Sequence, residues 1–274
     1  MNLALSTTWP ATFVKMNGTQ NDFVVLDERP PRYGDYGRLA REICDRNEGL
    51  GADGLLVVLE TDAGDAAMRI YNADGSEAEM CGNGVRCVAR YLAERGFGDT
   101  FTIATRAGAI ETEILSRQRG EYWVRVNMGV PQFPAAAAEE RVTVFDRAWT
   151  YIAVSMGNPH IVVPVIDVQS IDVEHLGRAL ATHPQFPNGT NVHFVEQTGR
   201  STLNVRHYER GVGITKACGT GVVASAAAFI QRGALRGPAI VVVPGGLLAV
   251  RWEPGGPAFL DGPAVIEYER TITP

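Results

Sequence analysis

The sequence predicts an α+β protein made of two pseudo-symmetric repeat domains, each a β-sheet wrapped around a central helix. Two observations carry this prediction. Short runs from the first half of the chain recur in the second half at one constant spacing, which indicates an internal duplication. In each half, several strand-like runs also surround one helix-like segment that is apolar enough to be buried.

The repeat is anchored on two cysteine motifs. Cys81 begins the run Cys-Gly-Asn-Gly, and Cys218 begins the run Cys-Gly-Thr-Gly. The separation of these two cysteines along the chain, the repeat spacing, recurs far outside the tetrapeptides, so we interpret the chain as two copies of one domain. Segment 130–138, rich in proline and alanine, is typical of a linker and marks the junction between the copies. Further pairs at the repeat spacing are Arg69 with Arg206, Tyr71 with Tyr208, Arg95 and Gly96 with Arg232 and Gly233, and Gly108 with Gly245.

The two central helices differ in their apolar patterns. The first is predicted from Gly84 to the stop signal Gly96, and its apolar residues recur at i, i+3, i+4 and i+7. The second is apolar on nearly every face over residues 222–230 and ends at Gly233, so we expect it to be buried all round.

Strands are predicted where β-branched and aromatic residues form short runs. In the first half these runs cover residues 23–26, 55–59, 67–71, 110–115 and 122–126. In the second half they cover residues 161–165, 191–196, 204–208 and 240–243.

Composition excludes several classes of protein. The 274 residues are 45% hydrophobic and 20% charged, which is typical of a packed soluble chain. The net charge is −6 with no basic cluster, which argues against nucleic-acid and anionic-membrane partners. No apolar run is long enough to span a membrane, and the N-terminus lacks the features of a secretory signal. Four cysteines without a Cys-x-x-Cys motif indicate free thiols, so we expect a cytoplasmic protein.

The repeated cysteines each stand where a helix begins. Free backbone N–H groups and the helix dipole stabilise an anion there, which lowers the pKa of a thiol and provides a site for a carboxylate. Inversion of a carbon stereocentre needs such a pair, because a thiolate removes a proton from one face while a thiol delivers a proton to the other. We therefore expect the active site in the cleft between the two domains, with Cys81 and Cys218 as its acid and base.

Five motifs include or accompany these cysteines: Asn17–Phe23 (NGTQNDF), Tyr71–Cys87 (YNADGSEAEMCGNGVRC), Gly157–His160 (GNPH), Tyr208–Gly211 (YERG) and Ala217–Gly221 (ACGTG). Together they resemble the diaminopimelate epimerase family. The resemblance implies an isomerase that interconverts LL- and meso-diaminopimelate without metal or cofactor, in lysine and peptidoglycan precursor biosynthesis. It also implies a small-molecule substrate, a homodimer, a first domain over 1–126 to which segment 264–274 returns, and a second domain over 127–263.

Roles for individual residues follow from the same resemblance. His160 and Glu209 stand where the family has groups that assist the thiols. They align with Phe23 and Asn72 of the first repeat, so the assisting groups occur in only one copy. Three positions depart from the family pattern, namely Asn17, Gly54 and Ile214. The implied substrate-binding residues are Asn21, Asn72, Gly82, Asn83, Asn158, Asn191, Glu209, Arg210, Gly219 and Thr220.

Alternatives remain open. A related racemase acting on proline or hydroxyproline would use the same paired cysteines, although Asn191 and Arg210 favour a substrate with a second zwitterionic end. A one-cysteine redox or hydrolase activity leaves the second copy unexplained. A catalytically silent anion-binding module is a third alternative. Segment 219–224 fits a dinucleotide fingerprint but lacks the preceding strand and the later acidic residue. The other histidines (His175, His183, His193 and His207) are interpreted as surface or packing residues, and Cys44 and Cys87 as core.

Overall fold

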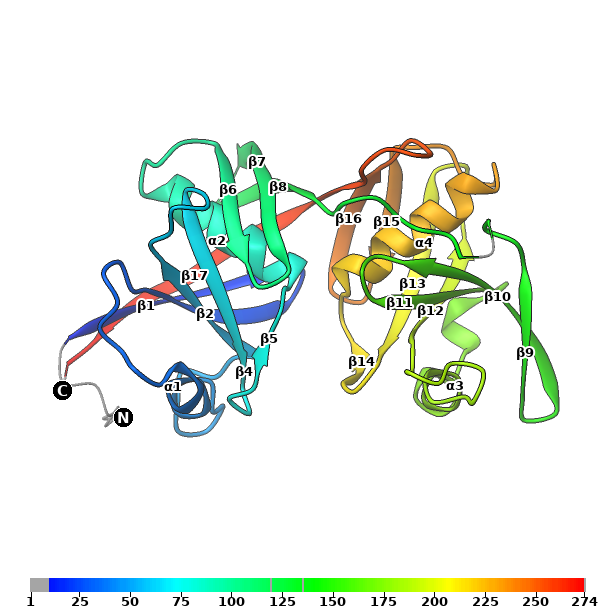
Figure 1. Ribbon diagram of the computed structural model, residues 1–274, viewed down its shortest axis with the longest axis horizontal. Coiled ribbons are helices and arrows are strands. Elements are labelled where there is room, and N and C mark those ends of the chain that lie inside the picture. Colours follow the sequence, from blue (N-terminus) through cyan, green and yellow to red (C-terminus); the bar gives the residue numbers. More distant parts are fainter. Residues whose placement is uncertain (1–9, 119, 135, 274) are drawn as a thin grey trace. The chain divides into compact units, whose positions relative to one another are not determined.

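The computed structural model describes residues 10–118, 120–134 and 136–273 (Figure 1). Residues 1–9, on which the prediction about a signal segment depends, lie outside these ranges, as does residue 135 of the predicted linker. The chain divides into two compact units: one runs to Val126 and resumes at Gly262, and the other spans Asn127–Asp261. In the described residues, no helix is both long and apolar enough to cross a membrane.

The first unit wraps its strands around helix α2 (Gly82–Glu94) and carries a shorter helix, α1 (Tyr36–Ile43). Strand β1 pairs antiparallel with β2, which pairs parallel with β3; β4 then pairs antiparallel with β3 and parallel with β6. The strands are β1 (Ala11–Gly18), β2 (Asn21–Asp27), β3 (Gly54–Leu59), β4 (Ala66–Asn72), β5 (Glu77–Ala78), β6 (Thr100–Thr105), β7 (Gly108–Gln118) and β8 (Glu121–Asn127).

The second unit repeats this order around helix α4 (Gly219–Gln231), with α3 (Val173–Ala181) and the 3₁₀ turn η1 (Val168–Ser170) outside it. Strand β10 pairs antiparallel with β11, which pairs parallel with β12; β13 pairs antiparallel with β12 and parallel with β15. The strands are β9 (Glu140–Val144), β10 (Arg147–Ser155), β11 (Pro159–Pro164), β12 (Asn191–Gln197), β13 (Thr202–Glu209), β14 (Gly213–Thr215), β15 (Ala239–Val243) and β16 (Gly246–Arg251).

The repeat spacing set by Cys81 and Cys218 holds through both units. It aligns α2 with α4 at both ends. The first residue of α1 likewise aligns with the first residue of α3, and the first residue of β3 with the first residue of β12. The prediction of an α+β fold with two repeats, each a sheet around a central helix, is confirmed. Helices α1 and α3 were not predicted, because at eight and nine residues each is close to the minimum length for a recognisable period.

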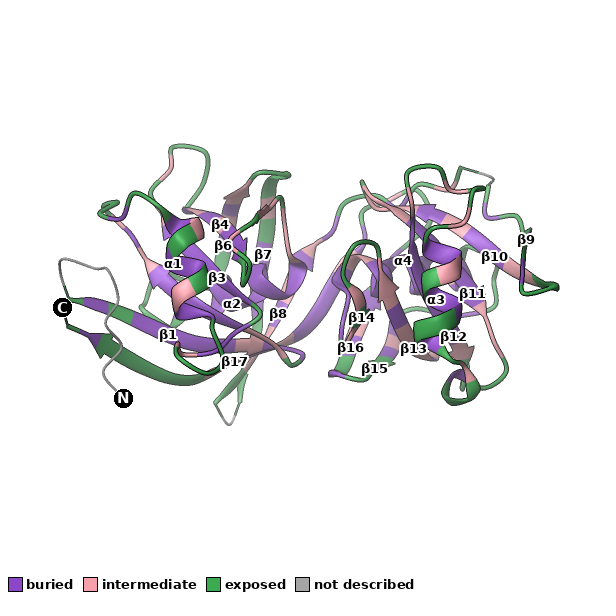
Figure 2. Cartoon of the chain, turned by 90° about the horizontal axis from the view of Figure 1, so that it is seen from below, coloured by how far each residue is buried: buried purple, intermediate pink, exposed green. Residues whose placement is uncertain are grey.

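Both central helices are buried, although their sequences differ (Figure 2). Helix α4 is apolar around its whole circumference, as its sequence predicted. Helix α2 instead buries two basic side chains that bond to backbone carbonyls: Arg86 Nε donates to Pro263 at 3.1 Å and Arg90 Nη1 to Ala264 at 2.6 Å. These two charged bonds hold the C-terminal part of the chain against α2.

Strand β17 (Phe259–Ile272) connects the end of the second unit to the first. Its beginning, Phe259–Asp261, pairs with β16, and its later part, Val265–Ile272, pairs antiparallel with β1. Segment 130–138 differs from the predicted linker, because its described residues are held to the second unit. The backbone of Gln132 bonds to that of Ser155 at 2.9 Å.

Candidate active site

Cys81 is the residue that precedes helix α2, with extended backbone angles (φ −144°, ψ 116°). Its side chain is half-buried, and its Sγ donates to Oδ1 of Asn21 at 3.7 Å. The same Oδ1 accepts from Nδ2 of Asn83 at 3.2 Å. Three residues assigned to the site from the sequence therefore meet within the first repeat, at the start of its central helix.

Asn21 is oriented by an acidic residue that the sequence did not reveal. Its Nδ2 donates to Oδ2 of Asp53 at 2.7 Å, and Nη2 of Arg46 donates to the other carboxylate oxygen at 2.8 Å. Because a carboxylate only accepts hydrogen bonds, Asp53 fixes which end of the Asn21 amide faces it. The carbonyl oxygen is consequently the end that faces Cys81.

Arg86 fixes Asn83 in the same way from inside helix α2. Its Nη2 donates to Oδ1 of Asn83 at 2.9 Å and to Oγ1 of Thr19 at 2.7 Å. A Cβ atom at Gly18, the last residue of β1, would lie 3.0 Å from the backbone carbonyl of Asn83 and 3.1 Å from Nη2 of Arg86, so the close packing here favours glycine. Asn72, another predicted residue of this repeat, donates from Nδ2 to Oγ of Ser76 at 3.0 Å across the turn that follows β4.

Cys218 stands at the start of α4 as Cys81 does at the start of α2. It is buried, and its Sγ lies 3.6 Å from Oγ1 of Thr220. Burial and then the negative charge of Glu209, which also accepts a hydrogen bond from the thiol, raise the pKa of Cys218 well above its usual value. The Thr220 hydroxyl and the Gly221 N–H act in the opposite direction. The start of the helix therefore acts in the expected direction at Cys218, but burial and Glu209 outweigh it.

Asn191 and Arg210 form a second polar group in the same repeat. Asn191 Nδ2 donates to the carbonyl of Pro159 at 2.9 Å, while its Oδ1 accepts from the backbone N–H of Arg210 at 3.0 Å. Nη1 of Arg210 bonds to the carbonyl of Asn188 at 2.8 Å. Asn191 thus ties β11 to the turn after β13 and holds the backbone of Arg210 in place.

His160 is part of a chain of buried histidines that was not predicted. Its Nε2 lies 2.8 Å from Oδ1 of Asn158, and its Nδ1 lies 2.8 Å from Nε2 of His193. Nδ1 of His193 is in turn 2.8 Å from Nδ1 of His207. All three rings are at most 1% exposed. Burial, and for His160 also the charge of Arg210, lower the pKa of His160 and of His207 to about 3.

The other two cysteines are buried and free, as interpreted from the sequence. Burial raises the pKa of Cys44 and of Cys87 to about 12. Cys44 follows α1 and Cys87 lies within α2, so neither stands at the start of a helix.

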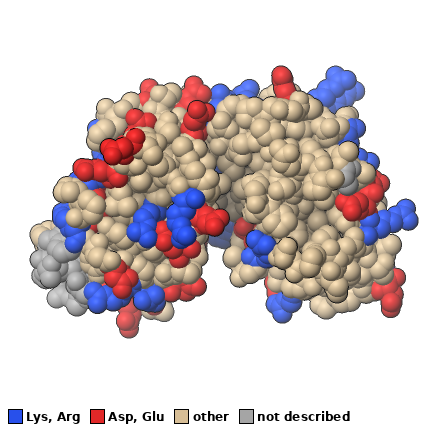
Figure 3. Space-filling view, in the orientation of Figure 1, with Lys and Arg blue, Asp and Glu red and all other residues tan. Residues whose placement is uncertain are grey.

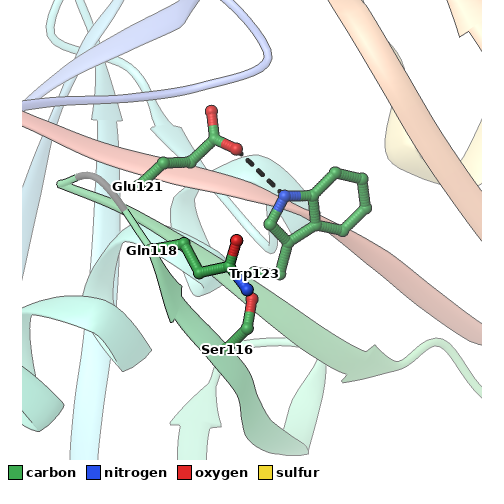
Figure 4. A pocket seen from close by; sticks show the side chains of 4 residues that line it. All are labelled: Ser116, Gln118, Glu121 and Trp123. Carbon is green, nitrogen blue, oxygen red and sulfur yellow. Dashed lines mark hydrogen bonds between the residues drawn. The ribbon is translucent and has the colours of Figure 1, made fainter.

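Away from these residues, a surface cavity of about 500 Å³ lies on the β7–β8 hairpin. Its lining is Ser116, Gln118, Glu121 and Trp123, and the indole of Trp123 donates to Glu121 at 2.9 Å (Figure 4). No residue assigned to the site lines it. Acidic and basic side chains are interspersed on the face of the first unit that Figure 3 shows. Within the described ranges, no group of three His, Cys, Asp or Glu side chains is placed to hold a metal ion.

Comparison with known proteins gives one consistent result. The family model described as "Diaminopimelate epimerase" matches residues 13–134 and 152–267. A protein named diaminopimelate epimerase from Carboxydothermus hydrogenoformans is 42% identical over 271 residues, covering 94% of this chain and 97% of its own. One of the same name from Desulfitobacterium hafniense is 40% identical over 274 residues, with the same coverage of both chains.

Solved structures share the fold at low sequence identity. A phenazine biosynthesis protein of the PhzF family from Bacillus anthracis aligns with a TM-score of 0.73 at 19% identity, over 97% of this chain and 99% of that one. A hydroxyproline epimerase from Agrobacterium vitis aligns with a TM-score of 0.69 at 15% identity, over 98% and 94%. The fold is therefore shared among these proteins.

Proposed function

The chain belongs to the diaminopimelate epimerase family of isomerases, and we propose on that premise that it interconverts LL- and meso-diaminopimelate by a two-thiol mechanism. One observation carries the proposal: a cysteine stands before the central helix of each repeat, at the same repeat position. A reaction that inverts one carbon needs a proton relay on each face, and the duplication supplies two.

The thiols are assigned different starting roles. Cys218 starts as the thiol, because burial and Glu209 both favour its protonated form. Cys81 is the base once its thiol has lost the proton that it donates in the structure, and the N–H groups at the start of α2 stabilise the resulting thiolate. It removes the α-proton, and the thiol that results donates to Asn21, as in the structure. At the same time Cys218 delivers its proton to the opposite face. Its new thiolate accepts from the Gly221 N–H and the Thr220 hydroxyl.

The remaining assigned residues bind and orient the substrate. The N-terminal N–H groups of α2 and α4, through Gly82, Asn83, Gly219 and Thr220, suit the α-carboxylate, whose negative charge grows as the proton leaves. Arg210 and the asparagine side chains bind the remaining charged groups of diaminopimelate. His160 assists the thiol chemistry beside Asn158, and Glu209 assists Cys218. We place the enzyme in the cytoplasm, in lysine and peptidoglycan precursor synthesis, as a homodimer that acts without metal or cofactor.

The test is incubation of the purified, chelator-treated protein with meso-diaminopimelate, followed by chiral analysis. We expect LL-diaminopimelate to form, and both Cys81→Ala and Cys218→Ala to lower the rate by at least the ~10²–10⁴-fold typical of an acid/base group. Cys87→Ala is the matched control, because this buried cysteine lies on α2 and should leave the rate nearly unchanged. Turnover of hydroxyproline in place of diaminopimelate, or full activity in either active-site variant, would overturn the proposal.

A further inference from the structure

The hydrogen bonds of the histidine chain, which comprises His160, His193 and His207, can be assigned proton by proton. The three rings are buried and neutral, so each carries one N–H and one bare nitrogen. Oδ1 of Asn158 only accepts, so the proton of His160 must be on Nε2. Its bare Nδ1 then accepts from Nε2–H of His193, and the bare Nδ1 of His193 accepts from Nδ1–H of His207.

The far end of the chain agrees with this direction. Nε2 of His207 is buried and has no hydrogen-bond partner in the part of the chain that the structure describes. In the direction just given, that atom is a bare nitrogen. If every bond ran the other way, the same atom would carry an N–H with no acceptor, and orphaned buried N–H groups are rare in proteins.

The first repeat shows that the fold does not require these histidines. At the repeat spacing, His160, His193 and His207 correspond to Phe23, Leu56 and Ile70, which are all buried. The contacts with the central helix correspond as well. Gly221 of α4 lies against the ring of His193, and Gly84 of α2 lies against the side chain of Leu56. An apolar row therefore fills the same place in one repeat, and the polar row in the other repeat has a role besides packing.

Few charges surround the chain. The charge of Arg210 lowers the pKa of His160 and so favours its neutral ring. Glu209 acts on Cys218, and α4 contributes no ionisable side chain over Gly219–Gln231. The internal hydrogen bonds, together with burial, therefore decide where the protons lie.

We propose that His193 and His207 are positioning residues that hold His160 with its proton on Nε2 and thereby fix the amide of Asn158. With Oδ1 turned to His160, the Nδ2 group of Asn158 is the end left for the substrate, and an N–H donor suits a carboxylate. This inference rests on the proposed function for the role of Asn158. The direction of the three bonds is a property of the protein alone and can be measured without substrate.

The first test is nitrogen-15 NMR of the enzyme labelled at histidine. We expect His160 and His193 to show the Nε2–H form and His207 the Nδ1–H form, and all three to stay neutral down to about pH 5. His175→Ala is the control for assignment of the signals, because this exposed histidine is not part of the histidine chain. A His160 ring protonated on Nδ1, or one that becomes charged near pH 6, would overturn the inference whatever the activity of the enzyme.

The second test compares two variants of the central ring. His193→Leu copies the first repeat and removes both hydrogen bonds, whereas His193→Gln keeps one donor and one acceptor. In His193→Leu we expect His160 to show both neutral forms. In a fraction of the molecules the Asn158 amide is then rotated so that Oδ1 instead of Nδ2 faces the substrate, and KM should rise by about twofold or more. We expect kcat to change less than KM, and His193→Gln to restore both the single form and KM.

The outcomes separate this inference from the proposed function. The NMR spectra could show the expected protonated nitrogens while the protein does not epimerise diaminopimelate. That result would reject the proposed function and leave the direction of the hydrogen bonds established. A His193→Leu enzyme with unchanged KM and a single Nε2–H form at His160 would show that His193 does not position His160.

Discussion

Replacing Gly221 by alanine should destabilise the second unit, whereas the same change at Gly84 should not. A Cβ atom at Gly221 would lie 2.7 and 2.8 Å from the two ring nitrogens of His193, and closer still to Cε1. At Gly84 the nearest atom is a terminal methyl carbon of Leu56 at 3.0 Å, which can move aside. The two positions are equivalent in the repeat, so each is the control for the other.

The magnitude follows from two opposing effects. Overpacking of a core costs about 1–3 kcal/mol, and replacing glycine by alanine in a helix returns up to about 1 kcal/mol. We therefore expect Gly221→Ala to lower the free energy of unfolding by about 1–2 kcal/mol. In a unit of this size that corresponds to a fall in Tm of about 4–8 °C. For Gly84→Ala the two effects nearly cancel, and Tm should change by less than about 2 °C.

The assay is thermal unfolding followed by calorimetry, which resolves the two units if they melt separately. His193→Leu by itself costs the two hydrogen bonds of the ring, so the comparison is made within that background. There a flexible side chain replaces the ring, and adding Gly221→Ala should cost clearly less stability than it costs in the unchanged protein. Equal effects at Gly84 and Gly221, or the same cost of Gly221→Ala with and without His193→Leu, would refute the close contact between Gly221 and His193.

Three further changes test the polar groups of the two repeats. Glu209→Gln removes a charge that raises the pKa of Cys218, so we expect thiolate absorbance at Cys218 to develop at lower pH and kcat to fall by about 10²–10⁴-fold. Asp53→Ala removes the carboxylate that orients Asn21, and loss of one charged hydrogen bond predicts a roughly tenfold or greater fall in kcat/KM. His207 has a folded pKa of about 3, below its usual 6.5, so it stabilises the fold fully above about pH 6.5 and progressively less as pH falls towards 3. His207→Ile should weaken that acid dependence in urea titrations.

Each of these has an outcome that would contradict it. A Glu209→Gln enzyme with an unchanged thiol titration would mean that the carboxylate does not act on Cys218. A normal kcat/KM in Asp53→Ala would separate Asn21 from the reaction. An unchanged pH dependence in His207→Ile would mean that another group causes the acid sensitivity, and the exposed His175→Ala variant is the control.

The duplication and the two cysteines that precede the central helices could be predicted because the relevant signals are local or periodic. Cys81 and Cys218 each begin a run that is recognisable over a few residues, and the repeat spacing aligns one run with the other. The central helices follow from composition, since α4 is apolar on every face. These predictions needed no knowledge of distant contacts.

The supporting polar groups could not be predicted in the same way. Asp53 and Arg46 lie in a loop, and only the fold brings them to Asn21. The histidine chain was within reach of the sequence, because the repeat spacing places His193 and His207 opposite two apolar residues. Taken one at a time, each of these histidines is typical of packing. Comparing the two repeats position by position is what reveals that a polar row replaces an apolar one.

The most direct measurement of the two-thiol claim is the isotope content at the inverted carbon during early turnover of meso-diaminopimelate in D₂O. Because the incoming proton comes from a different thiol than the one that removed the outgoing proton, the LL product should carry deuterium from the first turnovers. The unreacted meso substrate should still carry hydrogen. Substrate that exchanges its α-hydrogen as fast as product forms, or product that retains the original hydrogen, would show that a single group serves both faces and would contradict the account.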